Sequence, residues 1–181
     1  PEYVSSLMTS QHVPPAPRSA AGAACVDESP AVTRTPLSSP MTRRDPVEVE
    51  ATVWSLEQTC SLRRVLEVGC GEGDLVQRLL DRCVDACGMD GNPAAIAQSE
   101  RTMPGRCVLA TGARWPFGDA TFDTVVAVRV LHGGTAQEFE TALTELARVT
   151  KRHLLLHLPE GGGGPLPGDG VRRDRDWWER R

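Results

Sequence analysis

Apolar residues along the chain follow two kinds of spacing. Helical spacing, with apolar residues three and four positions apart, is found in segments 46–60, 75–80, 93–103 and 135–150. Short apolar runs typical of buried parallel strands occupy segments 65–68, 84–90, 106–110, 121–128 and 153–158. Strands that alternate with helices predict an α/β fold, with a doubly wound sheet of five parallel strands.

The first 45 residues lack any such pattern. They are rich in Pro, Ser and Ala and contain too little apolar surface to offset the entropy lost on ordering. We therefore expect a disordered tail over residues 1–45 and a single domain over residues 46–181. One hypothesis is that Met41, which stands just before the patterned sequence, is the natural start of the protein.

Composition argues against several kinds of partner. With a formal net charge of −4 and no polybasic stretch inside the domain, the chain is not expected to bind nucleic acid. No apolar run approaches the roughly 18 residues of a membrane-spanning helix, so no membrane span is expected. The six cysteines show no zinc-ligand spacing, so no metal is expected either. Reduced cysteines and a cytoplasmic location are the default expectations.

The first predicted strand runs into glycines at alternate positions, which are Gly69, Gly71 and Gly73. Glycine is needed where φ is positive or where a ligand approaches the main chain, so the pattern predicts a nucleotide-binding turn. A dinucleotide-binding G-x-G-x-x-G sequence would place its third glycine at position 74. Asp74 stands there, which disfavours a nicotinamide-dependent oxidoreductase.

Glu67 precedes the first glycine by two positions. The resulting pattern, Glu-x-Gly-x-Gly-x-Gly, resembles the first motif of the class I S-adenosylmethionine-dependent methyltransferases. The resemblance spans roughly residues 46–181 and implies a Rossmann-like fold with S-adenosylmethionine as cofactor. It further implies that the turn, Cys70 included, lies beside the methionine and ribose portions of the cofactor. Glu67 would hold the turn and orient the amino-acid end.

Asp90 ends the second predicted strand, where a ribose-binding acid is expected in this fold. Its carboxylate can accept hydrogen bonds from both vicinal hydroxyls of a ribose. Asp90 could instead cap the helix that Pro93 opens, but Asn92 suits that role better. The family resemblance makes Gly91 and Asn92 secondary candidates for contacts with the adenosine.

Segment 111–117 resembles the loop that flanks the adenine in this family. The family usually has an acid that accepts a hydrogen bond from the adenine amino group, and Thr111 stands at that position. A hydroxyl accepts without charge assistance, at an expected loss on the order of 1 kcal/mol. Gly112 and Ala113 are the other expected contacts of the adenine, including through the backbone around Ala113.

Arg129 and His132 follow the fourth predicted strand, which lies beside the first across the topological switch point. Ligands of doubly wound sheets bind there. His132 either acts as a general base toward an acceptor hydroxyl or amine, or only shapes the loop. Arg129 either contacts the cofactor or anchors an acceptor that carries a carboxylate.

The function predicted from these features is methyl transfer from S-adenosylmethionine to a small-molecule acceptor. The alternative is a catalytically inactive, methyltransferase-like subunit that binds the cofactor or a partner. Thr111 favours the alternative, as does the apparent absence of the antiparallel hairpin that ends the family's sheet. We expect a domain truncated at its C-terminus, and the oligomeric state stays open. Trp54 is expected either to line the pocket or to pack in the core or against another helix.

Overall fold

The computed structural model describes residues 6–9, 43–111, 114–128, 130 and 136–157. The helices are α1 (Pro46–Thr59), α2 (Asp74–Leu80), α3 (Pro93–Thr102) and α4 (Ala136–Val149). The strands are β1 (Ser6–Thr9), β2 (Arg64–Val68), β3 (Asp85–Asp90), β4 (Cys107–Leu109), β5 (Phe122–Val128) and β6 (Thr150–His157). Every helix and strand predicted from the apolar spacing is present, with ends that differ by a few residues.

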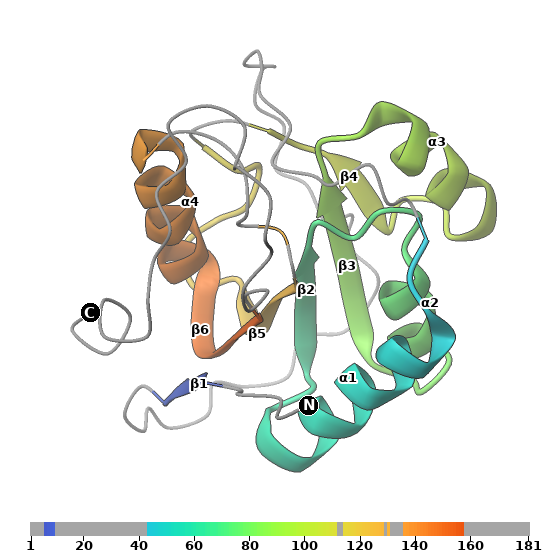
Figure 1. Ribbon diagram of the computed structural model, residues 1–181, viewed down its shortest axis with the longest axis horizontal. Helices are drawn as coiled ribbons and strands as arrows, with labels where there is room; N and C mark the ends of the chain where they lie inside the picture. The colour runs from blue at the N-terminus through green and yellow to red at the C-terminus, as the bar shows by residue number, and fades with distance from the viewer. Residues whose placement is uncertain (1–5, 10–42, 112–113, 129, 131–135, 158–181) are drawn as a thin grey trace, which may run out of the picture.

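The strands form one sheet in the order β1-β6-β5-β2-β3-β4 (Figure 1). The five strands from β2 to β6 pair in parallel with their neighbours, which confirms the predicted α/β, Rossmann-like fold. The chain moves outward from β2 to β3 and β4, then returns to place β5 on the other side of β2. The topological switch point therefore lies between β2 and β5.

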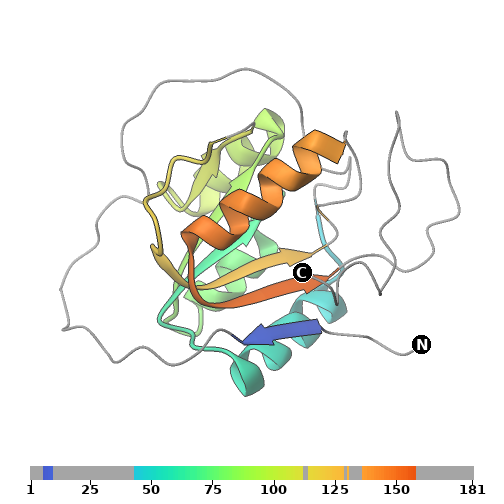
Figure 2. The same ribbon diagram turned by 90° about the vertical axis from the view of Figure 1, so that its left-hand side faces the viewer.

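Two apolar cores, one on each face of the sheet, hold the layers together. On one face α1, α2 and α3 pack against the sheet, and on the other face α4 and the segment after β4 do so (Figures 1 and 2). Side chains of β2 alternate between the faces, so that Val65 joins the first core and Leu66 and Val68 join the second. Glu67 consequently lies on the face covered by α1 and α2.

Two helices begin as their sequences predict. Asp45 caps α1 and Pro46 occupies its first helical position. Asn92 accepts hydrogen bonds from two backbone N–H groups of α3, which Pro93 opens. Asn92 is thus the cap of α3, as expected, and the Asp90 carboxylate is left for other partners.

The strand β1 lies within the segment that was expected to be a disordered tail. It pairs antiparallel with β6 at the sheet edge, with Ser6 opposite Leu156 and Thr9 opposite His153 (Figure 2). An edge strand offers unpaired N–H and C=O groups to any extended segment that reaches it, and four residues are too few to show a sequence pattern. Residues 6–9 thus depart from the expected disorder, and the domain boundaries stay predictions.

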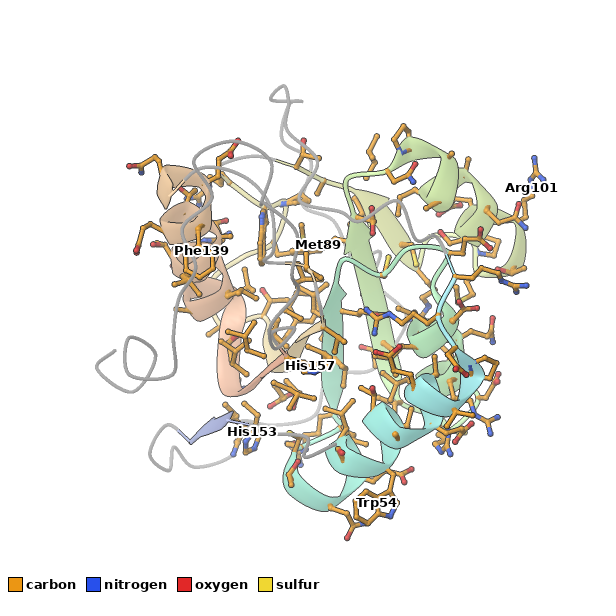
Figure 3. The ribbon with its side chains drawn as sticks, viewed as in Figure 1. Trp54, Met89, Arg101, Phe139, His153 and His157 are labelled. Atoms are coloured by element: carbon orange, nitrogen blue, oxygen red, sulfur yellow. The ribbon has the colours of Figure 1, made fainter. Side chains whose placement is uncertain are left out.

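Trp54 projects from the outer side of α1, away from the sheet, with 65% of its surface exposed (Figure 3). It therefore takes neither the core position nor the pocket position expected from the sequence. Among the cysteines, Cys87 takes part in a disulfide, so the expectation of reduced thiols is wrong at that position. Spacing along the chain does not identify disulfide partners, which explains the error. Within the described residues, no helix is long and apolar enough to cross a membrane.

Candidate functional site

The glycine turn lies at the carboxyl end of β2, between β3 and β5. Gly69, Gly71 and Gly73 all have positive φ, at 73°, 56° and 88°. A Cβ on Gly69 would lie 2.3 Å from a methyl group of Val130, and one on Gly73 would lie 2.4 Å from the Met103 methyl. Both the backbone conformation and the space around the turn therefore require glycine.

The turn is tied to β3 by its backbone. The N–H groups of Gly69 and Cys70 both donate to the carbonyl oxygen of Met89, at 2.8 and 3.0 Å. Cys70 is buried, and its thiol is hydrogen-bonded to that of Cys107 on β4. These contacts hold the turn against β3 and β4, so its shape is set by the sheet.

Asp90 braces the middle of the turn. One carboxylate oxygen accepts from the Gly71 N–H at 2.8 Å, and the other accepts from the Asn92 N–H at 2.7 Å. Asp90 is only 4% exposed, so these bonds are well shielded from water. Each carboxylate oxygen has a second lone pair, which leaves capacity for ligand hydroxyls. Ribose binding by Asp90 stays a prediction, and bracing of the turn is a second role that the sequence did not reveal.

Glu67 is fully buried beneath the turn. Burial raises the pKa of its carboxyl to about 7, and the charge of Arg44 opposes the rise while Asp74 and Asp90 add to it. The guanidinium of Arg44 is the nearest cation, with Nη2 at 2.8 Å from Oε1. The N–H of Val76 contributes a smaller favourable contact, but neither oxygen receives a well-directed hydrogen bond from the described residues.

Arg43 and Arg44 cross the turn just before α1. The backbone N–H of Arg44 donates to Asp74 at 3.0 Å, and its guanidinium donates to the Gly69 carbonyl at 3.3 Å. Arg43 lies on the surface and pairs with Glu72 and Asp74. Neither arginine belongs to a motif or an apolar pattern that predicts a role for it. One signal could have identified these arginines. They are two adjacent basic residues just before a capped helix, in a chain whose glycine turn carries several acidic residues.

The other expected site residues fall into two groups. Gly91 directly follows Asp90, and the Ala110 N–H donates to the Asp90 carbonyl at 3.0 Å, which brings half-buried Thr111 to the same edge of the sheet. The remaining expected site residues lie outside the described residues: Gly112, Ala113, Arg129 and His132. The structure thus gathers Glu67, the turn, Asp90, Gly91 and Thr111 at one edge.

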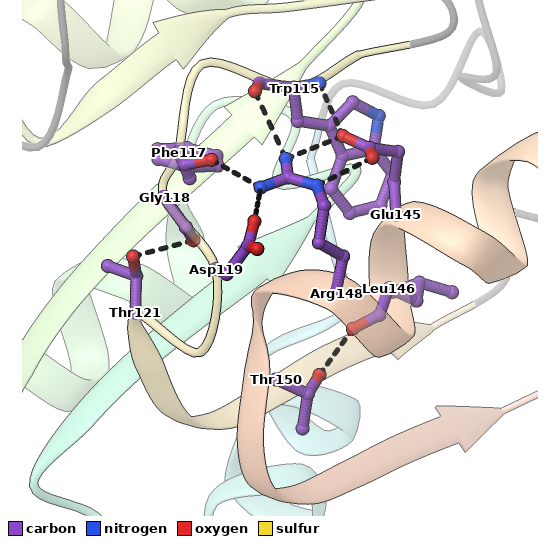
Figure 4. Close-up of polar contacts among 9 residues, drawn as sticks. All are labelled: Trp115, Phe117, Gly118, Asp119, Thr121, Glu145, Leu146, Arg148 and Thr150. Atoms are coloured by element: carbon purple, nitrogen blue, oxygen red, sulfur yellow. Dashed lines mark hydrogen bonds and ion pairs between the residues drawn. The ribbon is translucent and has the colours of Figure 1, made fainter.

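A buried ionic network braces the segment that follows Thr111 (Figure 4). Arg148 on α4 donates to both oxygens of Glu145 at 2.7 Å and to the carbonyls of Trp115 and Phe117 at 3.3 and 2.7 Å. Glu145 in turn accepts from the Trp115 N–H at 2.7 Å. Burial alone would raise the pKa of Glu145, but the hydrogen bonds and charge of Arg148 outweigh burial and lower it. Helical spacing predicts only the contact between Glu145 and Arg148, three positions apart on α4. The bonds to the carbonyls of Trp115 and Phe117 could not be read from it, because these residues are distant in sequence.

The buried position of Glu67 predicts a pH-dependent stability. Since its folded pKa of about 7 exceeds the usual value of 4.5, its contribution to stability is fully present below pH 4.5 and is lost as pH rises through 7. The unmodified chain and Glu67→Gln should therefore differ in how their unfolding free energies respond to pH. The unfolding free energy of the unmodified chain minus that of Glu67→Gln should fall by about 3 kcal/mol as pH rises across this range. Urea unfolding of both proteins at several pH values measures the difference. A difference that does not change with pH would contradict the prediction.

Comparison with known proteins agrees with this fold. Residues 65–153 match the sequence family described as "Methyltransferase domain". An uncharacterized methyltransferase from Mycobacterium tuberculosis is 30% identical over 103 residues, which cover 56% of this chain and 40% of that protein. The chain thus matches only two fifths of the length of this curated relative.

Among solved structures, the PH0226 protein from Pyrococcus horikoshii has a TM-score of 0.52 at 22% identity, over 58% of this chain and 52% of that one. At this identity the likeness shows the fold alone. A S-adenosylmethionine-dependent methyltransferase from Methanosarcina mazei has a TM-score of 0.49 at 23% identity, over 54% of this chain and 52% of that one.

The fold and the matched segment define a class I, Rossmann-like methyltransferase domain. Residues 65–153 belong to the methyltransferase family, and S-adenosylmethionine is the family's cofactor, as the sequence analysis predicted. The buried site fits this cofactor, because the Glu67 oxygens have unfilled hydrogen-bonding capacity within the described residues and Asp90 retains free lone pairs.

Proposed function

We propose that this domain transfers a methyl group from S-adenosylmethionine to a small-molecule acceptor. One arrangement of residues carries the proposal. Three glycines with positive φ lie between Glu67, which is fully buried, and Asp90, whose carboxylate holds the turn. Such an edge can hold the amino-acid end and the ribose of one ligand at once. The overall charge of −4, with no polybasic stretch, favours a small acceptor over a nucleic acid.

The protein's part in such a reaction is positioning. The bound cofactor supplies a methyl group on a sulfonium sulfur, and displacement needs an acceptor lone pair in line with the bond that breaks. In our proposal Glu67 and the turn hold the amino-acid end, and Asp90 holds the ribose. We expect Thr111, Gly112 and Ala113 to contact the adenine. We expect Arg129 and His132 to act near the transferred group, with His132 as the base that accepts a proton from the acceptor.

The alternative function is a methyltransferase-like subunit that binds the cofactor without transfer. Thr111, which stands where the family has a charge-assisted acceptor, is the observation that favours it.

Titration calorimetry with S-adenosylmethionine and S-adenosylhomocysteine, followed by assay of labelled methyl transfer to a panel of small nucleophiles, separates the two functions. Binding with turnover supports the enzyme, and binding without turnover across the panel favours the subunit. No binding of either ligand would overturn both.

A further inference from the structure

Two free cysteines meet beneath the glycine turn. Cys70 belongs to the turn and Cys107 to β4, and both are buried, with 2% and 6% of their surfaces exposed. Their thiols are hydrogen-bonded to each other. Two free thiols in contact can be joined by oxidation, so this pair is a site at which the chain can be modified.

Gly88 on β3 provides the room in which the two sulfur atoms meet. A Cβ on Gly88 would lie 2.6 Å from the Cys70 sulfur and 3.0 Å from the Cys107 sulfur. A Cβ on Gly73 would lie 3.3 Å from the Cys107 sulfur. Side chains at these two positions would push the thiols apart. The pair therefore occupies space that glycines leave open, one in the sheet and one in the turn.

The two thiols are unequal in reactivity. The hydrogen bond between them lowers the pKa of Cys107 and, together with burial, raises the pKa of Cys70. Thiolates are the form that oxidants attack, so Cys107 is the member that reacts first and Cys70 the one that resolves the product. Cys107 lies on a strand of three residues at the end of the sheet order. Short edge strands open locally at little cost in free energy, which admits a small oxidant.

We propose that Cys70 and Cys107 form a disulfide when a hydroperoxide oxidises the chain, and that this bond weakens cofactor binding at the glycine turn. The Cys107 thiolate attacks the peroxide O–O bond and becomes a sulfenic acid, while water or an alcohol leaves. The Cys70 sulfur then displaces the hydroxyl group from Cys107, which gives the disulfide and water. The two thiols lose two electrons, and the hydroperoxide gains them. Only the effect on the cofactor rests on the proposed function.

The disulfide would pull on the turn. Its S–S bond is about 2.05 Å long, much shorter than the contact between two hydrogen-bonded thiols, so the sulfur atoms must move together. The Cys70 N–H is bonded to the Met89 carbonyl, and the N–H of the next residue, Gly71, is bonded to Asp90. Movement of Cys70 therefore disturbs the bonds that shape the turn. Disulfide formation and cofactor binding then favour different shapes, and each opposes the other.

Peptide mapping of the full chain tests the disulfide itself. Trypsin should release Cys70 in peptide 65–78 and Cys107 in peptide 107–114. After treatment with hydrogen peroxide and blocking of the remaining thiols, mass spectrometry without reduction should detect these two peptides joined. Cys87 lies in neither peptide, so the disulfide that it forms does not contribute to this signal. No joined peptide, or oxidation to sulfinic acid alone, would overturn the inference.

Titration calorimetry with S-adenosylmethionine tests the effect on the cofactor. Oxidation of the unmodified chain should weaken binding by about 5- to 150-fold, the usual range for two coupled events. The coupling is reciprocal. In glutathione redox buffers, saturating S-adenosylhomocysteine should therefore shift the pair toward the free thiols by the same factor.

Two variants separate this effect from other damage by peroxide. Cys107→Ala cannot form the bond, so its affinity should be the same before and after oxidation. Cys60→Ala is the matched control, because Cys60 is also a free cysteine but lies at the end of α1. It should lose affinity on oxidation as the unmodified chain does. If Cys107→Ala fails to fold, the mapping and the reciprocal shift still test the inference on the unmodified chain.

A joined peptide with unchanged affinity for S-adenosylmethionine would overturn the control of cofactor binding and leave the proposed function intact. An equal loss of affinity in Cys107→Ala would do the same. If the reduced chain binds neither S-adenosylmethionine nor S-adenosylhomocysteine, the proposed function fails and the control of cofactor binding fails with it. The mapping would still decide whether the disulfide forms.

Discussion

Asp90→Ala is expected to weaken binding of S-adenosylmethionine by roughly 100-fold or more, equivalent to about 3 kcal/mol. The substitution removes the acceptor for the buried Gly71 N–H and for the Asn92 N–H. The turn then loses the hydrogen bond that holds its middle, and a bound ribose would lose the carboxylate that accepts from its hydroxyls. Charge-assisted bonds of this kind are about twice as strong as neutral ones, and an unpaired buried donor adds its own cost.

Two comparisons separate these contributions by calorimetry. Asp85→Ala, at the opposite end of β3, removes a half-exposed carboxylate that pairs with Arg64 and Arg106, and should leave affinity unchanged. S-adenosylhomocysteine and its 2′,3′-dideoxy analogue then report on the ribose. If Asp90 binds the hydroxyls, Asp90→Ala should cost far less affinity for the dideoxy ligand. Equal losses would assign Asp90 to the turn alone, and an unchanged affinity for S-adenosylhomocysteine would contradict both roles.

Arg148→Ala is expected to lower the unfolding free energy by about 3 kcal/mol or more, because it leaves a buried carboxylate without its cation. Glu145 is 4% exposed and receives two hydrogen bonds from Arg148. The carbonyls of Trp115 and Phe117 lose their donor as well. Since a domain of this size is stable by only about 5–15 kcal/mol, the loss would be a large share of the total.

Urea unfolding measures this effect, and Asp119→Ala is its control. Asp119 also pairs with Arg148 but its side chain is 78% exposed, so its removal should cost no more than about 1 kcal/mol. The double variant Glu145→Gln/Arg148→Met should recover part of the stability lost in Arg148→Ala, because no uncompensated charge remains. A loss below about 1 kcal/mol for Arg148→Ala would mean that α4 and the segment after Thr111 are held mainly by apolar packing.

The central part of the candidate site could be predicted because its chemistry is local in sequence. The glycines, Cys70 and Glu67 lie within seven consecutive positions, and a positive φ can be inferred wherever the chain must turn tightly. Asp90 could be predicted because the βαβ unit places its second strand end beside the first. Segments 112–113, 129 and 131–135 lie outside the described residues, so His132 and Arg129 stay predictions.

The contributions of Arg44, Arg148 and β1 could not be predicted, because each depends on residues distant in sequence. Arg44 meets Glu67 across 23 positions, and Arg148 meets the Trp115 carbonyl across 33. Neither arginine belongs to an apolar pattern or a short motif. The pairing of β1 with β6 joins residues 6–9 to the end of the described chain, and four residues carry no periodicity of their own.

By itself, the sequence determined the alternation of helices and strands, the parallel sheet and the position of the glycine turn, because apolar spacing and backbone conformation are local properties. Only the tertiary structure decided which charges surround the turn. Burial raises the pKa of Glu67 and leaves Arg44 with an unfilled donor, and burial is a property of the packed layers. The glycine turn is thus encoded locally, and the electrostatic environment around it arises from contacts between distant segments.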